Sequence, residues 1–114
     1  KTWLMECFSM EVCRDVRERC HRFTEESLEL VQSLGMERSE AHQLVDYVFD
    51  RPVGETHQEV GGTMVTLAAL CQALDQIDMD AEGEVELARV WQNIDKIRAK
   101  QAAKPRFSPL PGPP

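Results

Sequence analysis

Apolar residues recur every three or four positions along most of the chain, which is the spacing of one face of an α-helix. In the first third of the chain these positions run from Trp3 to Leu34, and Gly35 directly after them is a typical helix stop. Ser9 could cap a helix start and so separate the first few residues from the rest. The pattern predicts a first helical region over residues 3–34.

Three further helices follow from the same spacing. We expect one from about Ser39 to Phe49, ending ahead of a proline that disfavours helical backbone before it. Another begins near Gly54, and the last has Asp80 as its N-cap and runs to Ile97. Alternating strand patterns are absent, so the chain is predicted to be all-α, a bundle of four to five helices. The helix after Gly54 is expected to bury Val60, Met64, Leu67, Cys71 and Leu74.

Proline and chain length define the domain organisation. A chain of 114 residues fits one domain. Pro52 is the only proline before residue 105, and five follow from there to the end. Because proline is excluded from helix interiors, we expect a single helical domain over residues 1–104 and an extended, Pro-rich C-terminal tail over 105–114.

The net charge of −7 is unevenly distributed. Residues 1–95 carry 8 basic and 20 acidic side chains, whereas the last nineteen residues carry five basic and no acidic ones. An acidic body repels the nucleic-acid backbone, so nucleic acid is not an expected partner. No window has the length and apolar character of a membrane span, and no signal peptide is visible. We interpret the four cysteines as reduced core thiols of a cytoplasmic protein.

Three glutamates lie close together in the segment EESLE. Glu25, Glu26 and Glu29 are three or four positions apart, and on a helix each such like-charge pair costs about 0.2–0.5 kcal/mol. Arg22 precedes them by one turn and can offset part of this repulsion. A solvated acidic helix face is one interpretation of the cluster, and a metal site is the other.

A fourth glutamate favours the metal site. Glu59 lies in the third predicted helix, within a segment that is otherwise apolar and small. The nearby pair Gly61 and Gly62 costs about 0.8–1 kcal/mol per residue in a helix, which indicates that another backbone or a ligand needs the space. Glutamates from two helices would provide the hard oxygen ligands that Mg²⁺ or Mn²⁺ prefers.

The pattern E-E-x-x-E followed by an E-x-x-D-like motif resembles the MazG-like nucleotide pyrophosphohydrolases, an all-α NTP pyrophosphatase superfamily. The resemblance runs from about residue 21 to residue 104 and is similar to the small phage and bacterial type. It is carried by residues 21–30 (HRFTEESLEL), 58–67 (QEVGGTMVTL) and 96–100 (KIRAK).

The resemblance implies a metal site and a reaction. Glu26, Glu29 and Glu59 would bind Mg²⁺, with Mn²⁺ as a possible substitute, and Glu25 would orient or deprotonate the attacking water. Gly62 stands where the family motif has its aspartate, so additional water ligands or Asp46 would have to complete the site. The implied substrate is a nucleoside triphosphate, which is hydrolysed at the α-phosphorus to a monophosphate and pyrophosphate.

Two further expectations concern the substrate phosphates and the assembly. Lys96 and Lys100, one helical turn apart, and Asn93 are candidates to bind the phosphates, although a solvated helix end explains the lysines equally well. The family resemblance also implies a homodimer or higher homo-oligomer. The competing hypothesis is a degenerate, non-catalytic helical module for protein–protein interaction, which Gly62 supports and the retained glutamates oppose.

Overall fold

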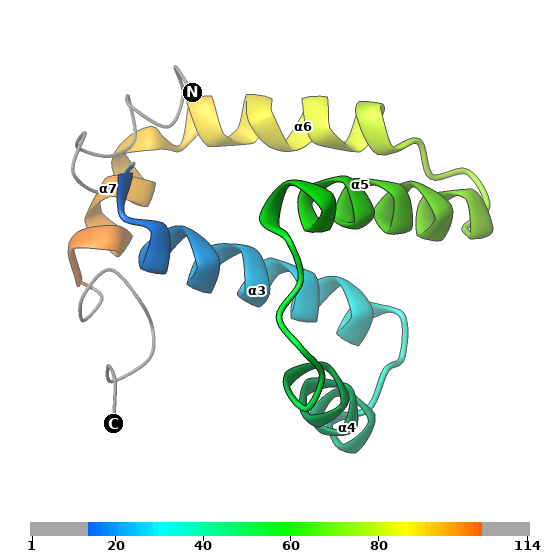
Figure 1. Ribbon diagram of the computed structural model, residues 1–114. Coiled ribbons are helices and arrows are strands. Elements are labelled where there is room, and N and C mark those ends of the chain that lie inside the picture. The colour runs from blue at the N-terminus through cyan, green and yellow to red at the C-terminus, as the bar shows by residue number, and fades with distance from the viewer. Residues whose placement is uncertain (1–13, 104–114) are drawn as a thin grey trace. The chain divides into compact units, whose positions relative to one another are not determined.

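The computed structural model describes residues 14–103, and this part of the chain consists of α-helices joined by turns and short loops, with no strand (Figure 1). The predicted all-α class is therefore confirmed. Residues 3–13 of the first predicted helical region and the Pro-rich tail lie outside the described residues. None of the described helices has the length and apolar character needed to cross a membrane. The helices are α3 (Val16–Ser33), α4 (Arg38–Phe49), α5 (Thr56–Ala73), α6 (Met79–Gln92) and α7 (Ile94–Ala103).

The chain divides into two compact units, with the boundary inside α6. The first unit consists of Lys1–Glu37 together with Ala88–Pro114, and its described part contains α3, the end of α6 and α7. The second unit is Arg38–Leu87, which contains α4, α5 and the first part of α6.

Both ends of α3 follow from specific residues. The Asp15 carboxylate caps the helix by accepting a hydrogen bond of 3.1 Å from the Glu18 backbone N–H. At the other end Gly35 has a φ of 99°, a left-handed conformation that glycine adopts without strain. The Met36 backbone N–H then donates to the Val31 carbonyl at 3.0 Å, which closes the C-terminal turn. The predicted stop at Gly35 is confirmed.

The start of α6 differs from the prediction. Asp78, not Asp80, accepts the capping hydrogen bond, from the Ala81 backbone N–H at 3.0 Å. Asp80 lies inside the first turn, where its negative charge still favours the helix N-terminus. The predicted cap at Asp80 was therefore wrong by two residues, because aspartates at both positions are compatible with a helix start.

The predicted helix from Asp80 to Ile97 is interrupted at Asn93. The Asn93 side-chain amide donates to the Arg89 carbonyl at 2.9 Å, and the Asn93 backbone N–H is shared between the carbonyls of Arg89 and Val90 at 3.1 and 3.2 Å. A side chain that bonds its own helix backbone in this way competes with regular helical bonding. The chain therefore continues as a separate helix, α7.

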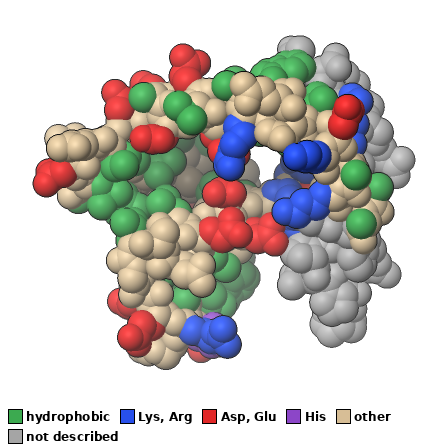
Figure 2. Space-filling model, turned by 180° about the vertical axis from the view of Figure 1, so that it is seen from behind, with side chains coloured by type: hydrophobic (Ala, Val, Ile, Leu, Met, Phe, Trp, Pro, Cys, Tyr) green, Lys and Arg blue, Asp and Glu red, His purple; other side chains and the backbone are tan. Residues whose placement is uncertain are grey.

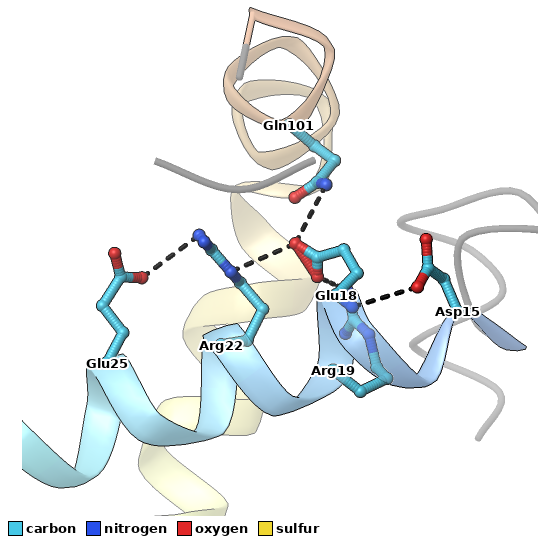
Figure 3. Close-up of polar contacts among 6 residues, drawn as sticks. All are labelled: Asp15, Glu18, Arg19, Arg22, Glu25 and Gln101. Atoms are coloured by element: carbon cyan, nitrogen blue, oxygen red, sulfur yellow. Dashed lines mark hydrogen bonds and ion pairs between the residues drawn. The ribbon is translucent and has the colours of Figure 1, made fainter. Parts of the chain in front are cut away.

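The buried side of α3 is polar. Glu18 is 1% exposed, and its carboxylate lies 2.6 Å from Arg19 Nη2 and 3.1 Å from Arg22 Nε (Figure 3). Gln101 of α7, also buried, donates a hydrogen bond of 3.2 Å to the same carboxylate. A carboxylate can be buried when charged and hydrogen-bonding partners surround it in this way. This network connects α7 to α3 within the first unit.

Most apolar residues that were predicted to form the core are exposed. Val60, Met64 and Leu67 are 57%, 63% and 37% exposed, and α4, α5 and α6 contain no buried residue. In α3, Phe23 of the predicted apolar face is 57% exposed. Hydrophobic side chains accordingly appear at the surface in the space-filling view (Figure 2). The expectation of burial was wrong because no described element of the second unit covers these positions of α5.

The cysteines also depart from the predicted core. Cys20 is exposed and Cys71 is partly exposed, and both are free thiols. The other two, Cys7 and Cys13, lie outside the described residues. The interpretation of Cys20 as a core thiol was therefore wrong.

Replacing Glu18 by alanine should lower the free energy of unfolding by about 3 kcal/mol, because it leaves two partly buried guanidinium groups without their carboxylate. Glu26→Ala, on the exposed surface of the same helix, is the control and should change it by no more than about 0.5 kcal/mol. Urea unfolding followed by circular dichroism measures both. Equal effects of the two substitutions would contradict a structural role for the Glu18 network.

Candidate functional site

The acidic cluster lies on the C-terminal half of α3. Glu26 and Glu29 are exposed, and within residues 14–103 neither carboxylate has an ion pair. They are three positions apart and therefore lie on neighbouring positions of the helix surface. Two unpaired carboxylates at this spacing can bind a hard divalent cation from the solvent side.

Glu25 differs from its two neighbours because it is held by an arginine. Arg22 Nη1 lies 3.1 Å from Glu25 Oε1, one turn along the helix (Figure 3). The Arg22 side chain is 19% exposed, whereas that of Glu25 is 40% exposed. Since Arg22 also pairs with the buried Glu18, its guanidinium is fixed between two carboxylates. This arrangement orients Glu25 while leaving its carboxylate accessible to solvent.

Sequence reasoning had assigned Arg22 to the acidic cluster but missed Glu18. The available signal was the spacing of four residues between Glu18 and Arg22, which places the two side chains next to each other on a helix. Nothing in the sequence indicated that this pair, rather than an apolar pair, would be the buried one.

Glu59 lies in the first turn of α5, in the second unit. The helix begins with Glu55 as its N-cap, whose carboxylate accepts hydrogen bonds from the backbone N–H groups of His57 and Gln58 at 2.9 and 3.0 Å. The exposed Glu59 side chain folds back against Gly54, so that a Cβ atom at Gly54 would lie 3.0 Å from Glu59 Cδ. The absence of a side chain at Gly54 therefore allows the Glu59 carboxylate to occupy this place.

A cavity of about 670 Å³ adjoins Glu59 within the second unit. Its lining combines the apolar end of α4 with Arg51, whose guanidinium carbon lies 4.4 Å from the centre of the Tyr47 ring. A cation over an aromatic face is held in place by the ring's negative charge distribution. The cavity thus offers an apolar wall, a cation and a carboxylate, and sequence reasoning had not identified Arg51 or Tyr47.

Gly62, which replaces the aspartate of the family motif, faces open space. A Cβ atom at Gly62 or at Gly61 would meet no heavy atom within 4 Å. Among residues 14–103, no steric contact therefore explains the glycine pair. Asp46, the predicted alternative ligand, is exposed on α4 in the same unit.

The predicted phosphate ligands lie at the end of α6 and on α7. Lys96 and Lys100 are exposed, one turn apart on α7. Asn93 is partly buried, and its amide is engaged by the Arg89 carbonyl. The two lysines are therefore available to an anionic ligand, whereas the Asn93 amide would first have to leave the helix backbone.

The structure does not bring the predicted metal ligands together in one unit. Glu26 and Glu29 belong to the first unit and Glu59 to the second. Among residues 14–103, no group of three or more His, Cys, Asp or Glu side chains lies close enough to hold a metal ion. The donor chemistry of the carboxylates fits Mg²⁺, and each unit by itself contributes fewer than three of them.

Comparisons with protein-family models, with curated proteins and with solved structures found no match to this chain. The functional interpretation therefore depends on the residues and on the resemblance of their motifs.

Replacing Gly62 by alanine should raise the free energy of unfolding by about 0.8–1 kcal/mol, because alanine favours the helix and the space beside Gly62 is open. Thermal or urea unfolding of wild type and variant gives the difference directly. A loss of stability would contradict the open space beside Gly62.

Proposed function

We propose that the protein is a metal-dependent nucleotide pyrophosphohydrolase, which converts a nucleoside or deoxynucleoside triphosphate and water into the monophosphate and pyrophosphate. The observation that supports this proposal best is the solvent exposure and ion pairing of the three glutamates of the E-E-x-x-E motif on α3. Glu26 and Glu29 are exposed carboxylates without an ion pair among the described residues, and Glu25 beside them is held by Arg22. The motif therefore combines two carboxylates that are open to a cation with a third whose position is held by an ion pair.

The proposed metal ligands are Glu26, Glu29 and Glu59, as the resemblance to the MazG-like family implies. Glu26 and Glu29 lie on α3 of the first unit, and Glu59 lies on α5 of the second unit. When bound, Mg²⁺ would neutralise charge on the substrate phosphates and polarise the attacking water.

Glu25 is the proposed catalytic residue. Arg22 occupies one of its oxygen atoms, which leaves the other free to orient a water molecule and to accept its proton. The oxygen of this water forms a bond to the α-phosphorus, and the bond between the α-phosphorus and the bridging oxygen breaks. Pyrophosphate leaves with the electron pair of that bond.

Cationic side chains are proposed to hold the phosphates. Lys96 and Lys100 on α7 are exposed and lie on the basic segment of an otherwise acidic chain. Asn93 remains a candidate only if its amide exchanges the Arg89 carbonyl for a phosphate oxygen. Following the resemblance, the proposed enzyme is a cytoplasmic homodimer or higher homo-oligomer.

A second candidate function is a non-catalytic helical module that binds other proteins. The exposed apolar side chains of α4 and α5 favour it, as does the glycine at position 62. The two candidates differ in turnover of nucleotides, so an activity assay separates them.

Adding Mg²⁺ or Mn²⁺ should raise the melting temperature by about 4 °C or more at saturating metal, because a ligand that binds only the native state stabilises it. Glu29→Gln should abolish most of this shift, since it removes a ligand charge and little volume. Glu37→Gln, an exposed glutamate outside the motif, is the matched control and should keep the wild-type shift. An unchanged shift in Glu29→Gln would remove Glu29 from the metal site.

Incubation of the protein with nucleoside and deoxynucleoside triphosphates and Mg²⁺ should yield a monophosphate and pyrophosphate in equal amounts. Separation of the products by anion exchange, with ³¹P NMR to identify them, makes the distinction. A diphosphate with orthophosphate would place the attack at the γ-phosphorus and contradict the family assignment. Metal binding without any product would favour the non-catalytic module.

A further inference from the structure

The link between α4 and α5 (Figure 1) and the first turn of α5 form the cavity of about 670 Å³ described above. It is lined by Val48 and Phe49 at the end of α4, by residues 51–54 of the link and by Glu59. All of these residues belong to the second unit, so the cavity does not depend on the first unit. Cavities that bind small molecules have volumes of about 300–1,000 Å³ and combine apolar walls with a few polar groups. The size and lining of this cavity therefore fit a small organic ligand.

Arg51 presents a cation to the cavity. Its guanidinium carbon lies 4.4 Å from the centre of the Tyr47 ring, and its backbone N–H donates to the Val48 carbonyl at 3.1 Å. Contact with the ring uses the flat face of the guanidinium and leaves N–H groups at its edge available to a ligand. Among residues 14–103 no carboxylate forms an ion pair with Arg51. The cavity thus contains a positioned cation without a counter-charge in the described part of the chain.

Glu59 presents a carboxylate to the same cavity because position 54 has no side chain. A Cβ atom at Gly54 would lie 3.0 Å from Glu59 Cδ and would overlap Glu59 Oε2. Gly54 precedes the N-cap Glu55, and Glu59 is the fourth residue of α5, a pair of positions that often carries two apolar side chains in contact. Within residues 14–103 the exposed Glu59 carboxylate has no ion pair, with Arg51 or with another cation. Two opposite charges therefore line one cavity without pairing with each other.

Apolar side chains that are open to solvent complete the lining. Phe49 is 81% exposed and Val53 is 99% exposed, and both line the cavity. An apolar group that contacts them removes apolar surface from water, which is favourable. A ligand that matches the whole lining carries a positive group, a negative group and an apolar group.

The charge of the second unit disfavours ligands with a net negative charge. Residues 38–87 contain two basic and eleven acidic side chains, a net charge of −9. A polyanion is repelled by this excess and by Glu59 inside the cavity, and a simple cation is repelled there by Arg51. A zwitterion has no net charge, so the two charges inside the cavity decide whether it binds.

We propose that this cavity binds a small zwitterion with an apolar group, namely an apolar α-amino acid or a short apolar peptide. The ligand ammonium group donates hydrogen bonds to the Glu59 carboxylate, and the Arg51 guanidinium donates to the ligand carboxylate. The apolar group contacts Phe49 and Val53. This binding does not rest on the proposed hydrolase activity. Because Glu59 is also a proposed metal ligand, the zwitterion and the metal would compete for its carboxylate.

NMR titration of the ¹⁵N-labelled full chain tests the proposal, with EDTA present and without nucleotide. The ligands are L-phenylalanine and the dipeptide leucyl-phenylalanine. At least one of them should bind with a Kd of about 1 mM or lower and shift the amide signals of Phe49, Arg51, Val53 and Glu59. Binding of phenylalanine identifies a free amino acid as the ligand class, and binding of the dipeptide alone identifies a peptide. No binding of either, or shifts confined to α3 and α7, would overturn the proposal.

Modified ligands that lack one charge separate the two polar contacts. N-acetylation removes the ammonium charge of the ligand, and amidation of the other end removes its carboxylate charge. Each change should weaken binding to the wild type about tenfold or more, because hydrogen bonds between charged groups are among the strongest. These measurements use the wild-type protein, so they stay valid should a variant fold poorly. Equal affinity of the three forms would overturn the proposal.

Arg51→Met and the matched control Arg38→Met test the carboxylate contact. Arg38, at the start of α4, is the other Lys or Arg of the second unit and does not line the cavity. Arg51→Met should weaken binding of the unmodified ligand about tenfold or more and change binding of the amidated ligand less than about threefold. Arg38→Met should leave both affinities within about threefold of wild type, with the same helix content by circular dichroism. Equal effects of the two substitutions would overturn the proposal.

Gly54→Ala tests the positioning of Glu59. The added methyl group would overlap Glu59 Oε2 and displace the carboxylate from its place beside the link. Binding of the unmodified ligand should weaken about fivefold or more, whereas binding of the N-acetylated ligand, which has no ammonium group to pair, should change less than about twofold. An equal loss for both ligands would overturn the assignment of Glu59 as the partner of the ammonium group.

Discussion

Burial of the Glu18 carboxylate is the constraint on which the first unit depends. A charge removed from water must be compensated by partners, and here two arginines and the amide of Gln101 provide them. Because Gln101 comes from α7, the position of this helix on α3 is fixed by a polar contact (Figure 3). One of the two arginines, Arg22, extends the network to Glu25. The orientation of the proposed catalytic carboxylate thus follows from the same interaction that organises the unit.

The burial of polar rather than apolar groups leaves much apolar surface exposed. In the second unit no residue of α4 or α5 is buried, although α5 is one of the most apolar segments of the chain. Apolar burial is the main favourable term in folding, and a unit of fifty residues with so little of it has little stability by itself.

The sequence predicts which residues form helices more reliably than what covers them. The glycine at position 35 predicted the end of α3, and α4 matches its predicted range to within one residue. The start of α3 at Val16, after the cap Asp15, was not predicted, because the apolar spacing continues without a break through this position. The same spacing assigned Val60 and Met64 to a core, yet both are exposed. Periodicity shows which side chains share a face but contains no information on the partner of that face. The break between α6 and α7 lies at Asn93, whose side-chain amide donates a hydrogen bond to the Arg89 carbonyl. The spacing of apolar residues continues through this position and so did not indicate the break.

The candidate site was also predictable only in part, because helical spacing shows which residues share one helix face and not which other helix lies near it. The spacing of Glu25, Glu26 and Glu29 places them on one helix surface, as the structure shows. Their relation to Glu59 is a long-range property, because the two helices belong to different units. That they bind the same metal ion is a proposal based on the resemblance to MazG-like enzymes. Local features such as Gly54 against Glu59, and Arg51 on Tyr47, became visible only in three dimensions.

The proposed enzyme needs Glu26, Glu29 and Glu59 to bind the same metal ion, and paramagnetic broadening can detect such a shared ion. Mn²⁺, added in small amounts to ¹⁵N-labelled protein, broadens the amide signals of residues close to the ion. If the ion is shared, signals near Glu26 and Glu29 and signals near Glu59 should broaden together at the same metal concentration, and excess Mg²⁺ should reverse both effects. Broadening confined to one of the two helices, or broadening of the two at clearly different concentrations, would contradict a shared site.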